Sequence, residues 1–153
     1  MNPLILIVLA VFVSLILRHY FLNKLKEKAE VDCSELRLSI GADEWKTAGY
    51  KQRYLYITGM YNGRTIRCEY YRRMVGAELI ITTKPTVVPK KIAWYKPLAN
   101  HPVIYKDCTL MYNTLYIQRN VQSPLSQENC AEILKDLVYT CELVESGNYN
   151  LEK

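Results

Sequence analysis

The segment RYLYITGMYNGRTIRCEYYRR, residues 53–73, decides the fold that this sequence of 153 residues predicts. Two runs rich in tyrosine, isoleucine and threonine flank Asn62-Gly63, a dipeptide that favours the two-residue type I′ turn of a β-hairpin. Because side chains alternate along a strand, one face of the returning strand should be buried: Ile66, Cys68 and Tyr70. The other face should be mixed in charge and solvated: Thr65, Arg67, Glu69, Tyr71 and Arg73.

Further strands are expected after this hairpin. Residues Glu78–Thr83 predict a third strand that ends at Lys84-Pro85, because proline has no amide hydrogen to donate to a sheet. Residues 86–101 are rich in proline and lysine and predict a long connection, in which 92–95 could form a short strand. Residues 108–112 and 115–118 then predict a second hairpin that turns at 113–114.

An amphipathic helix is the last element that the sequence predicts. Ser126 can cap its amino-terminal end, Gln127 and Glu128 suit its first turn, and Gly147 suits its end. Apolar residues recur at spacings of three and four: Cys130, Ile133, Leu134, Leu137, Val138, Cys141 and Val144. Charged residues should face away from this stripe: Glu132, Lys135, Asp136, Glu142 and Glu145.

A stripe of this kind usually buries against a sheet, so we expect an α+β domain. Its antiparallel sheet would be bent, either open or closed in part as a barrel, and packed by the one carboxyl-terminal helix. The second face of the sheet would be covered by residues 32–51, left polar, or used for contact. A short element is expected at 35–40.

An apolar segment precedes the domain. Residues Pro3–Leu17 (PLILIVLAVFVSLIL) contain no charge, and a helix from Leu4 to Leu22 would rise roughly 28 Å, enough to cross a bilayer core. The sequence therefore predicts one transmembrane anchor with a juxtamembrane extension, residues 1–31, and one soluble domain, residues 32–153. A cleaved signal peptide and a buried core helix are the alternatives. A signal peptide would have basic residues before the apolar segment and small residues at a cleavage site after it, and this sequence has neither.

The distribution of charge predicts how the anchor is oriented. Basic residues follow the apolar segment and none precedes it: Arg18, Lys24, Lys26 and Lys28. By the positive-inside rule, the amino terminus should lie outside and the domain in the cytoplasm. Five cysteines without a C-x-x-C pair agree with reduced, buried thiols. The basic group would attract anionic lipid headgroups or would only set the topology.

Catalytic and metal-binding patterns are weak. His101 with Cys108 or Cys68 could serve as base and nucleophile, although a loop histidine and core cysteines are the simpler interpretation. The two histidines and the scattered cysteines do not have metal-ligand spacing, and no glycine-rich phosphate motif occurs. Tyrosines and arginines in 64–73 could stack on nucleic acid, but Glu69 interrupts them. We therefore expect no enzyme activity, cofactor, metal, nucleic acid or small-molecule substrate.

The net charge of +5 points instead to a binding surface. Basic residues of the hairpin, the third strand and the connection could form one ridge: Arg64, Arg67, Arg72, Arg73, Lys84, Lys90, Lys91 and Lys96. This ridge would contact anionic lipid headgroups or a protein partner, unless its side chains are simply solvated. The expected function is a non-enzymatic binding or assembly module at the cytoplasmic face. The alternative is a single-span accessory subunit of a larger membrane complex, although the anchor has no G-x-x-x-G face.

The hairpin also carries a resemblance. The pattern G-x-Y-N-G-R-x-I-R-C-E-Y-Y, behind an apolar span and before Lys84-Pro85, resembles uncharacterised membrane-anchored proteins of bacteria. The resemblance would cover residues 54–145 and implies strands followed by a final amphipathic helix, without a known activity. More loosely, Trp45-Lys46 and Lys51-Gln52-Arg53-Tyr54 resemble the basic first hairpin of pleckstrin-homology-like domains, which close a bent antiparallel sheet with one helix.

Overall fold

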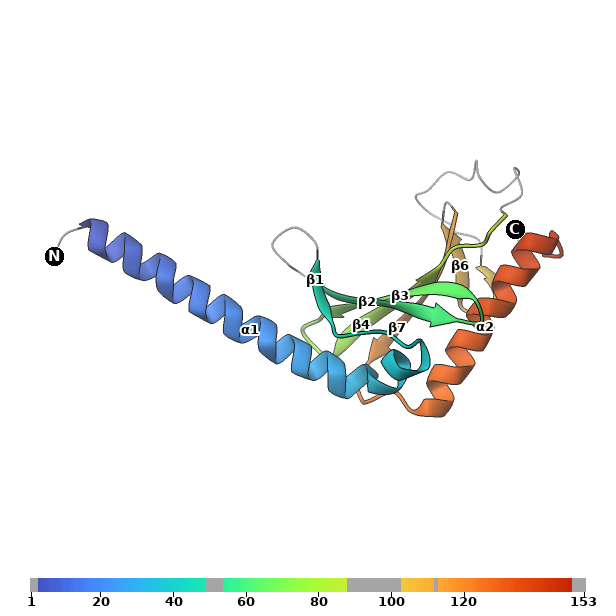
Figure 1. Ribbon diagram of the computed structural model, residues 1–153, viewed down its shortest axis with the longest axis horizontal. Helices are drawn as coiled ribbons and strands as arrows, with labels where there is room; N and C mark the ends of the chain where they lie inside the picture. The colour runs from blue at the N-terminus through green and yellow to red at the C-terminus, as the bar shows by residue number, and fades with distance from the viewer. Residues whose placement is uncertain (1–2, 49–53, 88–102, 112, 150–153) are drawn as a thin grey trace.

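The computed structural model describes residues 3–48, 54–87, 103–111 and 113–149 and contains two helices and seven strands in them (Figure 1). The elements in chain order are α1 (Pro3–Ser39), β1 (Lys46–Ala48), β2 (Tyr54–Tyr61), β3 (Arg64–Arg72), β4 (Ala77–Thr83), β5 (Val103–Tyr105), β6 (Cys108–Met111), β7 (Thr114–Val121) and α2 (Gln127–Ser146). The predicted α+β class is confirmed. The possible strand at 92–95 lies outside the described residues.

Helix α1 is longer than expected and belongs to two environments. Its amino-terminal part extends away from the domain, whereas its carboxyl-terminal part packs into the domain (Figure 1). Ala29 and Cys33, one turn apart, are completely buried, and so is Leu36 further along α1. The helix therefore does not end near residue 31, and the boundary expected between residues 31 and 32 falls inside it. A kink at Cys33 (φ −132°, ψ 22°) turns the last part of the helix.

The end of α1 explains how the helix meets the sheet. Gly41 has a φ of +59°, and the amides of Gly41 and Ala42 donate to carbonyls in the last turn, which is a typical helix termination. The carbonyl of Ile40 then accepts a 2.7 Å hydrogen bond from the amide of Met60 on β2. The chain end of α1 is thereby fixed directly to a strand.

The strands form one antiparallel sheet in the order β1-β2-β3-β4-β7-β6-β5. Tyr61 pairs with Arg64, so Asn62 and Gly63 form the predicted two-residue turn, with φ of +48° and +73°. The sheet stays open between the edge strands β1 and β5, and it does not close into a barrel. These two strands of three residues each are too short to give a periodic sequence signal.

Both helices contribute to the core on one face of the sheet. Helix α1 contacts β2 and α2, while α2 contacts β5, β6 and β7. The sheet side of this core consists largely of alternate strand residues: Leu55, Ile57, Ile66, Cys68, Tyr70, Leu79, Ile81, Leu115 and Ile117. The predicted buried face of β3 is confirmed, and so is the buried stripe of α2. Within the described chain, no helix packs on the opposite face.

The ends of α2 agree with the sequence, but its outer face differs from the prediction. The Ser126 side chain accepts a hydrogen bond from the Asn129 amide, and Gly147 ends the helix with φ +73°. Asp136 and Glu145 do not simply face solvent, because each of them forms an ion pair with a strand or turn residue. Lys106, in the β5–β6 turn, contacts both Glu132 and Asp136.

Candidate functional site

Helix α1 is the one helix of the described chain that is long and apolar enough to cross a membrane, with a mean hydropathy of 2.4 over its most apolar window. None of that window is buried in the protein. The large apolar side chains from Leu4 to Leu17 are 46–67% exposed. A core helix would bury such residues, so this exposure argues against the core-helix interpretation and is consistent with contact with lipid.

The domain begins very close to the end of this apolar segment. Ala29, the first completely buried residue of α1, follows Leu22, where the predicted span ends, by only seven positions. Seven helical residues rise about 10 Å. If the span lies in a bilayer, the domain therefore lies next to the headgroups rather than on a long tether.

The turn between β3 and β4 lies beside this part of α1. Together they enclose a hollow of about 590 Å³, lined by Lys24, Leu25, Glu27, Lys28, Val31, Asp32, Arg72, Arg73, Met74 and Gly76. The turn is narrow, since the Arg73 amide donates to the Gly76 carbonyl. Gly76 has a φ of +69°, and an added Cβ would approach the Val121 carbonyl oxygen to 2.6 Å, so glycine is required there.

The tip of this turn carries the most exposed apolar residues among the described residues of the domain. Met74 is fully exposed and Val75 is 80% exposed, while Arg72 and Arg73 flank them. Met74 and Val75 were not predicted as binding residues, although two apolar residues between two arginines and a glycine are a recognisable local pattern. What only the structure shows is that this turn faces the basic part of α1 across the hollow.

The charges around the hollow are partly neutralised. Lys24 pairs with Glu27 at 2.7 Å, Lys28 pairs with the buried Asp32 at 3.2 Å, and Arg73 pairs with Glu78. Arg72 forms no ion pair with any described residue. Four basic and two acidic side chains line the hollow, so its charge is positive overall.

The structure does not bring the predicted basic ridge together on one surface. Arg64 and Arg67 lie on opposite faces of the sheet, because their positions in β3 differ by an odd number of residues. Arg72 and Arg73 lie at the other end of β3, beside α1. Lys84 is exposed just after β4, and Lys90, Lys91 and Lys96 lie outside the described residues. Binding by any of these residues stays a prediction.

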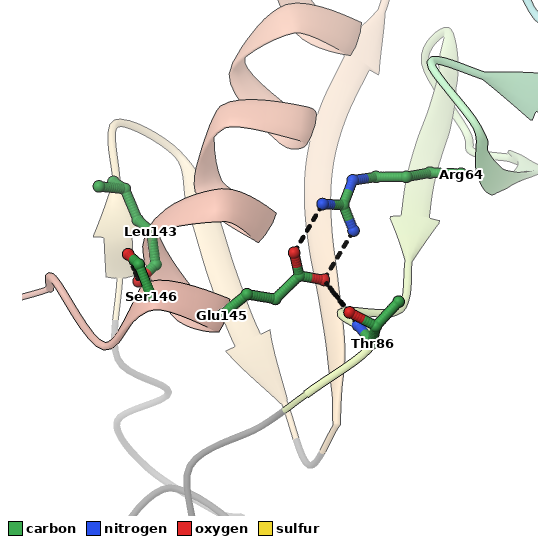
Figure 2. A network of polar contacts seen from close by, with 5 residues as sticks. All are labelled: Arg64, Thr86, Leu143, Glu145 and Ser146. Atoms are coloured by element: carbon green, nitrogen blue, oxygen red, sulfur yellow. Dashed lines mark hydrogen bonds and ion pairs between the residues drawn. The ribbon is translucent and has the colours of Figure 1, made fainter.

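Arg64 has a structural partner on α2. Its guanidinium donates two hydrogen bonds to the Glu145 carboxylate, at 2.8 and 2.7 Å, and Thr86 donates two more from its amide and hydroxyl (Figure 2). The Arg64 hydrogen bonds, assisted by those from Thr86, lower the pKa of Glu145 to about 2. Arg64 therefore holds the end of α2 to the β2–β3 hairpin, and two of its donors are not free for a ligand.

The opposite face of the sheet is rich in tyrosine. Tyr54 stacks on Tyr71 with ring centres 4.7 Å apart, and the Arg67 guanidinium lies 4.1 Å from the centre of the Tyr56 ring. Glu69 joins this group, accepting hydrogen bonds from Arg67 and from the Tyr71 hydroxyl. The predicted mixed face of β3 is confirmed, but its charged groups are bound to one another rather than simply solvated.

The cysteine candidates are placed poorly for nucleophilic chemistry. All five cysteines are free and buried. Burial raises the pKa of the thiols of Cys68 and Cys108, which disfavours the reactive thiolate. Their candidate base, His101, lies outside the described residues, and among the residues described no group of three potential ligands could hold a metal ion.

The remaining basic residues of the juxtamembrane segment lie along α1. Arg18 and Lys24 are exposed, as is Lys28, while Lys26 is half-buried at a second hollow that Glu30, Arg37 and Trp45 also line. They follow the apolar segment on the same continuous helix.

Comparisons with family models, curated proteins and solved structures find no match. The resemblances to bacterial membrane-anchored proteins and to pleckstrin-homology-like domains thus stay predictions.

Proposed function

We propose that this chain is a membrane-anchored, non-enzymatic binding or assembly module that works at the cytoplasmic face of a membrane. The observation that carries the proposal is the double role of α1: an exposed apolar segment and a buried core segment belong to the same helix. A cleaved signal peptide would not need this continuity. A helix that supplies core residues also holds the domain within about 10 Å of the span.

The cytoplasmic orientation rests on charge. Four basic residues follow the uncharged segment 3–17 within the length that matters for topology: Arg18, Lys24, Lys26 and Lys28. Free, buried cysteines are compatible with a reducing compartment. A non-enzymatic role is supported by the raised thiol pKa values and by the use of Arg64, Arg67 and Arg73 in internal ion pairs.

An accessory subunit of a larger membrane complex is the second candidate function. The observation that favours it is the tyrosine-rich sheet face, which no helix of the described chain covers. Tyrosine and arginine are enriched where proteins contact one another. Native electrophoresis of gently solubilised membranes distinguishes the two: a species of the mass of the single chain contradicts the subunit, and a larger, discrete species supports it.

Membrane extraction combined with protease protection tests the main proposal. The full chain with a carboxyl-terminal tag should stay in the membrane pellet after alkaline carbonate treatment. In sealed vesicles with the cytoplasmic face inward, the tag should resist added protease until detergent opens them. A tag that is digested without detergent would contradict the orientation, and a chain that carbonate releases would contradict the anchor. A variant that lacks residues 3–22 is the control and should be soluble.

A further inference from the structure

We propose that the hollow between α1 and the β3–β4 turn binds the headgroup of an anionic phospholipid while Met74 and Val75 enter the membrane interface. This inference rests on the proposed function, because it requires that α1 spans a bilayer. The sequence predicted either anionic lipid or a protein as the partner of the domain, and the present proposal chooses lipid. The domain would then be held by two membrane contacts, the span and the turn.

Depth along α1 supports the location. Lys24 and Lys28 follow Leu22 by two and six residues, which corresponds to about 3 and 9 Å along the helix axis. A headgroup layer is roughly 5–8 Å thick on each side of the hydrocarbon core. The α1 wall of the hollow thus lies at headgroup depth and just beyond it. The turn lines the other wall of the same hollow, so it lies at a similar depth.

The chemistry of the turn supports lipid over an acidic protein segment. Met74 and Val75 contact water almost completely in the isolated chain, which is unfavourable for apolar side chains. Adjacent Arg72 and Arg73 can keep their guanidinium groups among phosphates while the apolar tip enters the acyl boundary. An acidic peptide would pair with the arginines but would leave the two apolar side chains in water.

The available charge supports an anionic headgroup. Arg72 has no ion-pair partner among the described residues, and a guanidinium can bind phosphate through two parallel hydrogen bonds. Lys24 and Lys28 each have one carboxylate neighbour, but both side chains are about half exposed and can contact a phosphate as well. Each such residue near an anionic surface adds attraction, so Arg72, Lys24 and Lys28 together should distinguish anionic from neutral lipid.

A fluorescent probe on the turn tests the proposal in the full chain. Because all five native cysteines are buried, the variant Val75→Cys can be labelled selectively with a polarity-sensitive dye. Met60→Cys is the matched control, because Met60 is also an exposed apolar residue near a hairpin turn. Met60 lies on β2 and pairs with Thr65, at the end of β3 that is far from Arg72. Both proteins are placed in nanodiscs of phosphatidylcholine, with or without phosphatidylglycerol.

The emission of the dye at position 75 should shift to shorter wavelength and should be quenched by spin-labelled lipid. Both effects should be stronger when phosphatidylglycerol is present. The emission of the dye at position 60 should neither shift nor be quenched. Arg72→Gln on the labelled Val75→Cys background should need about fivefold more anionic lipid for half of the shift, as expected for the loss of one basic contact. Lys135→Gln, on the exposed face of α2, should leave the titration unchanged.

Three results would overturn the inference. A dye at position 75 that stays in water in both kinds of nanodisc excludes the second membrane contact and leaves the patch to a protein partner. A shift that is equal with neutral and anionic lipid excludes the headgroup site. An Arg72→Gln titration equal to that of the parent excludes Arg72 from it. Failure of the proposed function is distinct, because the chain would then not enter nanodiscs at all.

Discussion

The hydroxyl of Tyr70 on β3 donates a 2.5 Å hydrogen bond to the buried carboxylate of Asp32 on α1. Lys28, one turn earlier on the helix, contacts the same carboxylate, and Trp45 packs edge-on against the Tyr70 ring. Burial and the neighbouring carboxylate raise the pKa of Tyr70, which keeps its hydroxyl protonated as a donor. This contact joins the helix that carries the anchor to the centre of the sheet.

Replacing Tyr70 with phenylalanine should lower the free energy of unfolding by about 1–3 kcal/mol, because the buried Asp32 carboxylate loses the hydrogen bond that it accepts from the Tyr70 hydroxyl. Denaturant unfolding of the full chain in detergent measures this loss. Tyr71→Phe is the control, since its hydroxyl bonds to Glu69 on the face without a helix, and it should cost less. An equal loss of unfolding free energy in the two variants would show that the hydrogen bond to Asp32 stabilises the fold no more than the hydrogen bond to Glu69.

Replacing Gly59 with alanine should separate α1 from β2. An added Cβ would lie 2.1 Å from the carbonyl oxygen of Ile40, a backbone atom that cannot move without breaking the hydrogen bond from Met60. We expect a loss of about 2–3 kcal/mol from this overpacking, measured by unfolding. Thr58→Ala, one residue earlier and on the other face of β2, should cost under about 1 kcal/mol. A stable Gly59→Ala variant would contradict the close approach.

Stability at acid pH should depend on Glu145. Its folded-state pKa is about 2, below its ordinary value of 4.5, so its contribution is complete above pH 4.5 and is lost as the pH falls from 4.5 towards 2. The Glu145→Gln variant should be about 2 kcal/mol less stable at neutral pH and should lose less stability across that window. Unfolding measured at a series of pH values checks this expectation. Glu142→Gln, one turn away and exposed, should reproduce the parent curve; a Glu145→Gln curve parallel to the parent would contradict the assignment.

The place where the chain can be shortened follows from the core residues of α1. A variant that starts at residue 29 keeps Ala29, Cys33, Leu36 and Ile40 and should be a folded, soluble domain. A variant that starts at residue 41 loses all four and should unfold or aggregate, because several buried side chains would be missing at about 2–5 kcal/mol each. Circular dichroism and thermal unfolding of the two variants provide the test. Cooperative unfolding of the shorter variant would show that α1 is not part of the core.

Much of this fold could be predicted from local patterns. The Asn62-Gly63 turn, the stripe of α2 and its caps at Ser126 and Gly147 depend on nearest neighbours in the chain, and each was confirmed. The end of α1 could not be predicted, because Ala29, Cys33 and Leu36 are buried through contacts with distant segments and a kink at Cys33 interrupts the helical periodicity.

The candidate site was harder to predict because it depends on contacts between distant segments. Arg64 is bound by Glu145, which follows it by 81 residues, and no local pattern indicates that pair. The ridge hypothesis added basic residues from both faces of β3, and strand alternation alone could have separated Arg64 from Arg67. Met74 and Val75 became candidates for a membrane contact only because the structure places the β3–β4 turn beside Lys24 and Lys28.

Amide hydrogen exchange of the full chain in nanodiscs tests most directly that the span and the core share one helix. We predict continuous protection along α1 from the span to Asp32, just before the kink at Cys33, including residues 23–28, which connect the two parts. Fast exchange confined to residues 23–28, with protection on both sides, would mean a flexible tether and would contradict the central claim.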